Sequence, residues 1–273
     1  MSPLIVALIV AAVASAFCWI ASLVTKDTSW VDRIWSIIPV VYVWVFAIAA
    51  GLRDPRLDVM AVLVLLWGAR LTFNFARKGG YAGIGGDHED YRWAVLRGRM
   101  SPAQFQVFNL LFIVIFQNAV LFLIASPAWT AFAHRTPFGV LDVVLAVLFI
   151  GFLVGETVAD QQQWSFQRWK RGEAAAGREP SPRFRQTGLF RVSRHPNFFF
   201  ENAQWWVVAA FGIVAARGLD WTCLGIVLLL AIFIGSTRFT EAITRSKYPE
   251  YAEYQRRTSP VIPWFPRRRS PSA

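Results

Sequence analysis

The segment PLIVALIVAAVASAFCWIASLV (residues 3–24) contains no charged side chain. A helix of about 20 apolar residues is long enough to cross the hydrocarbon core of a bilayer. The segment therefore predicts a transmembrane helix. No basic residue precedes it, and Trp19 stands where a cleavage site would need a small residue. We interpret it as a retained span and not as a signal peptide.

Further apolar segments follow along the chain. Of its 273 residues, 55% are hydrophobic and 16% are charged, which is far from the composition of an average soluble domain. The pattern predicts an all-α polytopic integral membrane protein with about seven transmembrane helices. It also predicts a single membrane domain over residues 1–273, with 248–273 as an interfacial basic tail. The other predicted spans are 34–51, 57–76, 105–125, 138–156, 196–216 and 221–240.

The formal net charge of +11 is unevenly distributed along the chain. Lys and Arg gather in 70–99, 168–194 and 238–269, whereas the alternate connections 52–58, 126–137 and 217–220 carry little net charge. Because basic loops face the cytoplasm, seven spans place the N-terminus outside and the C-terminus inside. This asymmetry accounts for the charge without nucleic acid and favours contact with anionic membrane lipids.

Cations and a proline precede the sixth span in GLFRVSRHPNFFFENAQWW (188–206). Pro196 suits the first position of a helix, where its missing N–H costs nothing. A helix that begins there presents backbone N–H groups and a positive dipole to an anion. Arg191 and Arg194 add fixed charge, and His195 and Asn197 add hydrogen-bonding groups. The stretch predicts a phosphate-binding site at the cytoplasmic face.

Glu201 lies one helical turn after Asn197, on the same face and inside an apolar span. Ionisable side chains within spans usually mark function, so Glu201 is a candidate for a deeper cofactor contact. The alternative is an interfacial Arg/His cluster that anchors the helix, with Glu201 paired to an arginine.

Other polar residues fall on helix faces next to the predicted cytoplasmic side. Arg70 and Arg77 are two turns apart on the third span. The fifth span is predicted to continue as GETVADQQQWSFQRWKRG (155–172), which includes Asp160. For Glu241, the alternatives are an ion pair with Arg245 four residues later and a role in the site. We expect Asp142 to be solvated.

Several motifs in the same order resemble the steroid 5-alpha-reductase superfamily, and most closely a bacterial branch once labelled as of unknown function. Besides 188–206, they are SWVDRIW (29–35), WGARL (67–71) followed by EDYRW (89–93), GETVADQQQWSF (155–166) and the tail 248–264. The resemblance covers nearly the whole chain. It implies NADPH bound between the last spans and the cytoplasmic loops. It also implies a location in the bacterial inner membrane.

The resemblance implies roles for individual residues. The implied cofactor contacts are Asp160, Arg194, Asn197, Glu201 and Tyr254, with Arg70 and Arg77 serving the phosphates. The same superfamily includes isoprenylcysteine carboxyl methyltransferases, which share the Arg-His-Pro motif and bind S-adenosylmethionine. The alternative cofactor is therefore S-adenosylmethionine.

The sequence departs from the reductase pattern at a few positions. Phe200 stands where the family usually has Gly, and Phe198 where it has Tyr. The steroid reductases also use a Glu and a Tyr to polarise the substrate ketone, and the nearest counterparts here are Asp32 and Trp67. Asp32 is therefore the candidate catalytic acid, and a classical steroid is not the expected substrate.

The leading hypothesis is an oxidoreductase that acts on CH–CH groups, with NADPH reducing a lipophilic enone or related alkene. The alternatives are a methyltransferase acting on a lipid-like substrate and a non-enzymatic lipid-binding protein. The expected partners are membrane lipids and a lipophilic small molecule. The glycine-rich GGYAGIGG (79–86) lacks the strand of a dinucleotide-binding unit. The run from Asp87 to Asp90 is interpreted as solvated, and no metal site is predicted.

Overall fold

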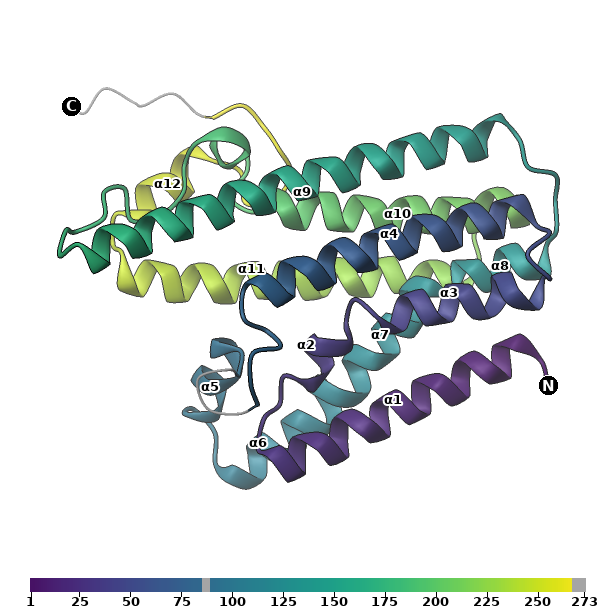
Figure 1. The fold of residues 1–273 in the computed structure, drawn as a ribbon, viewed down its shortest axis with the longest axis horizontal. Helices are drawn as coiled ribbons and strands as arrows, with labels where there is room; N and C mark the ends of the chain where they lie inside the picture. Colours follow the sequence, from purple (N-terminus) through teal and green to yellow (C-terminus); the bar gives the residue numbers. More distant parts are fainter. Residues whose placement is uncertain (85–88, 267–273) are drawn as a thin grey trace. The chain divides into compact units, whose positions relative to one another are not determined.

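The computed structural model describes residues 1–84 and 89–266, and every named element within them is helical (Figure 1). The all-α prediction is therefore confirmed. The elements are α1 (Pro3–Thr25), α2 (Trp30–Ile34), α3 (Ile38–Ala49), α4 (Pro55–Arg77), α5 (Tyr91–Arg97), α6 (Pro102–Phe108), η2 (Asn109–Phe116), α7 (Gln117–Ala125), α8 (Pro127–Ala133), α9 (Val140–Ala175), η3 (Gly188–Arg191), α10 (Pro196–Ala216), η4 (Trp221–Cys223), α11 (Leu224–Lys247) and α12 (Tyr251–Arg257).

Within the described residues, seven helical segments are long and apolar enough to cross a membrane, which agrees with the predicted number. The fourth is longer than predicted, because it runs over Pro102–Ala133 and not only over 105–125. Its middle part, η2, is a π-helix. The fifth continues well past the apolar segment, as the sequence indicates, so that α9 is 36 residues long.

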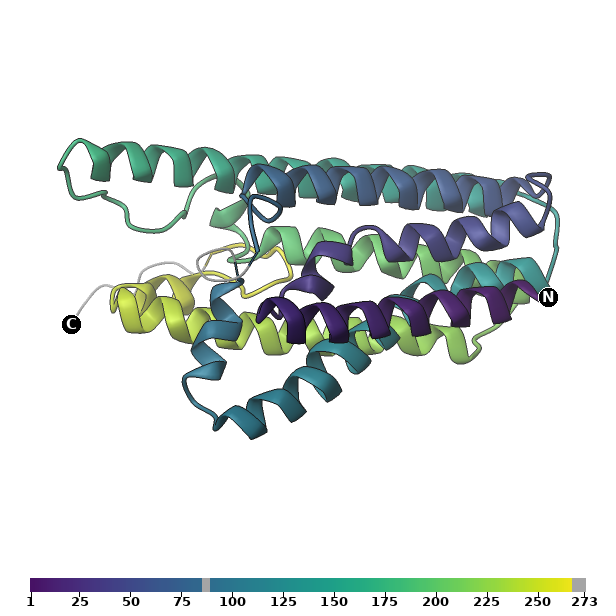
Figure 2. The same ribbon diagram turned by 60° about the horizontal axis from the view of Figure 1, so that its bottom comes forward.

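The chain forms two compact units, each with its own packing. The first unit contains residues 1–149 and 205–229, and the second contains 150–204 and 230–273. In the first unit, α3 packs against α1, α4, α7 and α8. Figure 2 shows α1 and α3 from a second direction.

Helix caps in the first unit follow from the local sequence. Ser2 precedes Pro3, and its hydroxyl accepts a hydrogen bond from the amide of Ile5. Asp54 precedes Pro55 in the same way and accepts from the first free amides of α4. A polar cap followed by proline is a typical helix start, so these bounds follow from the sequence.

Asp142 is fully buried in the first unit, so the expectation that it would be solvated is wrong. Its carboxylate accepts two hydrogen bonds from Arg56, at 2.6 Å from Nε and 2.9 Å from Nη2. Arg56 also donates to the hydroxyl of Thr136 at 2.6 Å, and Asp142 accepts from the amide of Gly139 at 2.8 Å. The acid is buried because an arginine distant in sequence neutralises it.

Candidate functional site

The entrance to the 188–206 stretch is fixed by a glycine that contacts α9. Gly188 has a φ of +67°, and a Cβ atom there would lie 2.5 Å from Oε1 of Gln162. The same oxygen accepts a hydrogen bond from the amide of Leu189 at 3.0 Å. Only glycine tolerates both this backbone conformation and this close approach. The stretch is therefore anchored to α9 at its first residue.

The residues before Pro196 pair with a segment near the end of the described chain, which we call the C-terminal strap (residues 258–264). The amide of Arg194 donates to the carbonyl of Ser259 at 2.8 Å, and the amide of His195 donates to that of Pro260 at 3.0 Å. The amide of Trp264 donates to the carbonyl of Val192 at 2.9 Å. The strap thus holds the chain as it enters α10, which begins at Pro196 as predicted.

The guanidinium of Arg194 is largely committed to protein partners. It donates to both carboxylate oxygens of Glu241, at 2.6 Å from Nε and 2.9 Å from Nη2. Its Nη1 donates to the carbonyls of Gln255 and Thr258. The side chain is only 8% exposed. In this geometry Arg194 positions α10, α11 and the strap, and its contact with a phosphate stays a prediction.

Glu241 is a buried carboxylate whose partners the sequence did not reveal. Its carboxylate pairs with Arg194, not with Arg245, and also lies 3.0 Å from Nε2 of His195. It accepts further hydrogen bonds from Gln255 at 2.8 Å and Tyr251 at 3.3 Å. Burial raises the pKa of the Tyr251 phenol, which keeps it a donor. We call these five side chains the Glu241 cluster; Figure 1 shows the helices that carry most of them, α11 and α12.

Tyr254 lies next to the Glu241 cluster on α12 and is buried. Its hydroxyl donates to the carbonyl of Phe190, and its ring stacks on Phe184 at a centroid distance of 5.6 Å. Burial raises the pKa of this phenol too, so the hydroxyl remains protonated. Tyr254 therefore holds the 188–206 stretch through its hydrogen bond to Phe190. Its contact with a cofactor stays a prediction.

Buried polar side chains line the facing parts of α9 and α10 within the second unit. Asp160, Glu201 and Glu156 are at most 7% exposed, and Gln204 is fully buried. The amide of Gln204 donates to a carboxylate oxygen of Glu156 at 2.6 Å. Gln204 was not predicted, although its position three residues after Glu201 places it on the same helix face. Asn197 is half-buried at the start of α10, and Arg191 is exposed.

The phenylalanine that replaces the family glycine is accommodated by a glycine on α9. A Cβ atom at Gly155 would lie 2.5 Å from the ring of Phe200. Phe200 also contacts Phe152, with ring centroids 6.4 Å apart. The ring therefore fills space against α9 in the second unit.

Three predicted site residues belong to the first unit. Arg70 is half-buried on α4, and Arg77, the last residue of that helix, donates to Asn74 at 2.9 Å from Nε and 2.7 Å from Nη2. Asp32 lies on α2 and accepts from the indole of Trp93 at 2.9 Å. Because the other candidates belong to the second unit, a common site stays a prediction.

The loop around Asp32 is fixed by further ion pairs. Arg33 is buried and donates to Asp27 at 2.8 Å and to the carbonyl of Gly83 at 3.0 Å. Glu89 accepts from the hydroxyl of Thr28 and from Nη2 of Arg97, both at 2.6 Å. Asp87 and His88, the other potential metal ligands of this run, lie outside the described residues.

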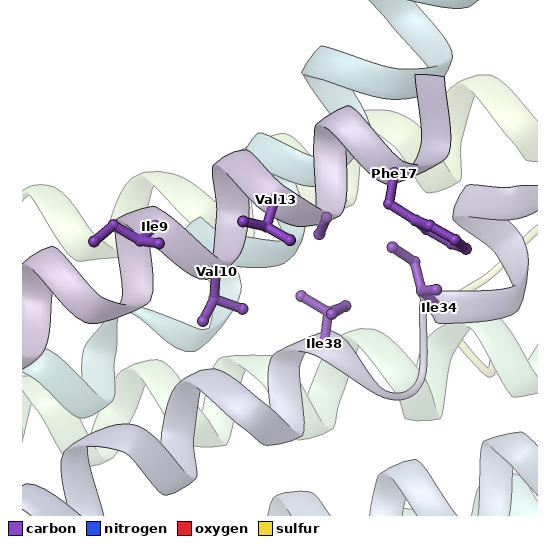
Figure 3. Close-up of a pocket in the computed structure, with 7 residues that line it drawn as sticks. Ile9, Val10, Val13, Phe17, Ile34 and Ile38 are labelled. Atoms are coloured by element: carbon purple, nitrogen blue, oxygen red, sulfur yellow. The ribbon is translucent and has the colours of Figure 1, made fainter. Parts of the chain in front are cut away.

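An apolar pocket of about 350 Å³ lies in the first unit, where α1 faces α2 and the start of α3 (Figure 3). Its wall on α1 includes Val10, Val13 and Phe17, and Ile34 and Ile38 face them. Ile34 belongs to the same short helix as Asp32. The pocket can hold a hydrocarbon group beside the segment that carries the candidate acid.

Comparisons with known proteins agree with the motif resemblance at the level of the family. Residues 18–258 match the family described as protein of unknown function DUF1295, which is in the steroid 5-alpha-reductase-like group. An uncharacterized protein of Schizosaccharomyces pombe, C594.04c, is 37% identical over 279 residues, covering 96% of this chain and 80% of that protein.

This relative is fungal, so it gives no support to a bacterial inner membrane. No solved structure matches the chain significantly. The match includes six complete spans, the end of α1, the 188–206 stretch and Glu241. The chain therefore belongs to the DUF1295 family of membrane proteins.

Proposed function

We propose that the protein is a membrane-embedded, NADPH-dependent reductase of a lipophilic enone or related alkene. The observation that carries the proposal is the set of buried polar side chains on α9 and α10, which lie in segments that are otherwise apolar. Buried carboxylates and amides within spans are costly, and they usually mark a substrate or cofactor pathway.

The polar residues of the second unit fit the amide and ribose groups of a nucleotide cofactor. Oε1 of Gln204, Oδ1 of Asn202 and Oε1 of Gln163 are buried and have no hydrogen-bond partner in the described part of the chain. Unsatisfied buried acceptors are unfavourable, so N–H and O–H donors of a ligand would stabilise them. Asn197, Glu201 and Asp160 would complete the hydrogen bonding of such a ligand.

In this proposal the Glu241 cluster positions the cofactor segment and does not bind phosphate directly. Arg194 and His195 are tied to Glu241, which leaves Arg191, Arg70 and Arg77 as candidate phosphate cations. The basic segments before α10 and after α11 lie on the side that the charge pattern assigns to the cytoplasm. The site would open on that side.

Asp32 would act on the substrate. The apolar pocket between α1, α2 and the start of α3 would hold the hydrocarbon part of the substrate. NADPH, when bound, would supply a hydride to the β-carbon of the enone. Negative charge then develops on the carbonyl oxygen, where a protonated Asp32 would donate a hydrogen bond. The indole of Trp93 fixes the orientation of Asp32, because it donates to Oδ2 at 2.9 Å.

A second candidate function is methyl transfer from S-adenosylmethionine to a lipid-like substrate. One observation favours it: the guanidinium of Arg194, beside α10, is paired with Glu241, and the imidazole of His195 contacts the same carboxylate. A cofactor without a diphosphate needs fewer free cations, so this arrangement suits S-adenosylmethionine better than the sequence alone suggested. The buried amides and carboxylates could serve either cofactor.

The test is equilibrium binding of NADPH and of S-adenosylmethionine to the purified protein in detergent. We expect NADPH to bind and Glu201→Gln to weaken it about tenfold, because a hydrogen bond to a charged group is lost. Glu250→Gln is the matched control, since Glu250 is exposed. Binding of S-adenosylmethionine alone would establish the second candidate. If neither NADPH nor S-adenosylmethionine binds, the result would favour a lipid-binding protein without catalytic activity.

A further inference from the structure

A second pocket in the first unit carries positive charge and no carboxylate among its lining residues. It has a volume of about 260 Å³, several times the roughly 30 Å³ of a water molecule. It lies where α1 ends and contacts the loop before α2, the end of α5 and the helix α6. The lining residues are Ser22, Leu23, Lys26, Thr28, Arg97 and Gln106.

The two cations of this pocket have unused hydrogen-bonding capacity. Lys26 is exposed, and no ion pair or hydrogen bond involves its ammonium group in the described residues. Arg97 uses Nη2 for Glu89, but its Nε is buried and lacks a partner there. Its guanidinium lies over the ring of Phe105 at 4.6 Å, which holds it in place. A buried donor of this kind is stabilised by an anion.

Exposed apolar side chains of α1 lie beside the pocket. Leu23 is 45% exposed, and Val24 and Ile20, beside it on α1, are 77% and 60% exposed. In a membrane this surface contacts acyl chains, whereas Lys26 lies at the headgroup level just beyond the end of the helix. The site therefore combines an anion-binding end with a hydrocarbon-binding flank.

We propose that this pocket binds the phosphate group of an anionic phospholipid, with an acyl chain along Ile20, Leu23 and Val24 of α1. A free phosphate ion shares the anionic chemistry but not the hydrocarbon contact. The site is distinct from the buried residues of α9 and α10, and it does not depend on the reaction that the protein performs.

The experiment is a thermal-unfolding titration of the full chain in a non-ionic detergent, with phosphatidylglycerol, phosphatidylcholine, inorganic phosphate and NADPH as separate additions. We expect saturable stabilisation by phosphatidylglycerol and none by phosphatidylcholine. Lys26→Gln should weaken the apparent affinity about fivefold, the effect of one lysine at a membrane surface. Arg256→Gln, which removes an exposed charge from α12, should leave the affinity unchanged.

Each alternative outcome has a defined meaning. Stabilisation by inorganic phosphate at similar affinity would support the anion pocket but assign it to a soluble ligand. Equal loss in the Lys26 and Arg256 variants would show only general attraction and would overturn the site. Competition by NADPH would assign the pocket to the cofactor and overturn a lipid site. If Lys26→Gln fails to fold, Gln106→Ala tests the same pocket from an exposed position on α6.

Discussion

Two buried arginine–carboxylate pairs have nearly the same geometry and different surroundings. In both Arg56–Asp142 and Arg194–Glu241, the distances from Nε and Nη2 to the carboxylate are 2.6 and 2.9 Å. Around the first pair, the further partners are a threonine side chain and backbone groups. Around the second, the carboxylate also receives a histidine, a tyrosine and a glutamine.

The difference separates a pair that joins two helices from one that also holds the 188–206 stretch. Arg56–Asp142 joins α4 to the start of α9, and its polar groups are satisfied by hydroxyl and backbone groups that do not titrate. The Glu241 cluster joins the segment before α10 to α11 and α12, and it includes the side chain of His195 at 3.0 Å from the carboxylate. The first pair is expected to affect stability alone, and the second to affect both stability and the 188–206 stretch.

The largest effect is expected for Asp142→Ala. Arg56 is 2% exposed, so the substitution leaves a buried cation without its counter-ion. We expect the free energy of unfolding to fall by about 3–5 kcal/mol. Thermal unfolding in detergent measures this, with Val143→Ala as the control because Val143 is exposed. Equal unfolding temperatures for the two variants would contradict a stabilising pair.

Glu241→Gln should have a smaller effect on stability, about 2 kcal/mol, because glutamine keeps part of the hydrogen bonding. Its distinctive effect is local. The amides of Arg194 and His195, which donate to the C-terminal strap, should exchange their hydrogens faster. Hydrogen-exchange mass spectrometry of the peptides around 190–200 and 255–266 reports this. Unchanged exchange there would show that the strap holds without the cluster.

Gly155→Ala should destabilise the second unit without changing the Glu241 cluster. It therefore shows whether faster exchange at the C-terminal strap requires loss of the cluster or follows from any loss of stability. The added Cβ meets the ring of Phe200 at 2.5 Å. Overpacking should outweigh the better helix propensity of alanine and leave a net loss of about 1 kcal/mol. Phe200→Ala in the same chain should remove the penalty in a double-mutant cycle. The cycle fails to support the contact if the two losses simply add.

Asp220 offers a carboxylate whose partners are threonines and not an arginine, and its effect should be no larger than that of Gly155→Ala and smaller at low pH. Burial raises its pKa, but hydrogen bonds from Thr130 and Thr222 outweigh burial and hold the pKa below its ordinary value. A lowered native pKa stabilises the fold above the unfolded value, and this stabilisation is lost as the pH falls through the native pKa. We expect Asp220→Ala to cost about 1 kcal/mol at pH 7 and progressively less below about pH 4. A difference that does not depend on pH would contradict this account.

The sequence was sufficient for features that depend on local patterns. The number of spans follows from hydropathy, the start of α10 at Pro196 follows from proline geometry, and the long α9 follows from its continued polar face. Each requires only neighbouring residues, so no knowledge of tertiary contacts was needed.

Ion pairs between residues that are distant in the chain could not be predicted from the sequence. Asp142 is neutralised by Arg56, 86 residues earlier, and Glu241 pairs with Arg194, 47 residues earlier. The helical spacing from Glu241 to Arg245 suggested a local pair, but the bidentate pair with a buried guanidinium is the one that forms. Gln204 could have been found, because it continues the face of Asn197 and Glu201 and is polar within a span.

The C-terminal strap also affects the order in which parts of the chain can fold. The amide of Arg194 finds its acceptor 65 residues later, at Ser259, after α10 and α11. During synthesis the Arg-His-Pro segment must therefore remain without these partners until both spans are in the membrane. Long-range closure of this kind is slow compared with helix formation. The last spans would insert before the Arg-His-Pro segment acquires its final shape, which requires the synthesis of Ser259 and Pro260.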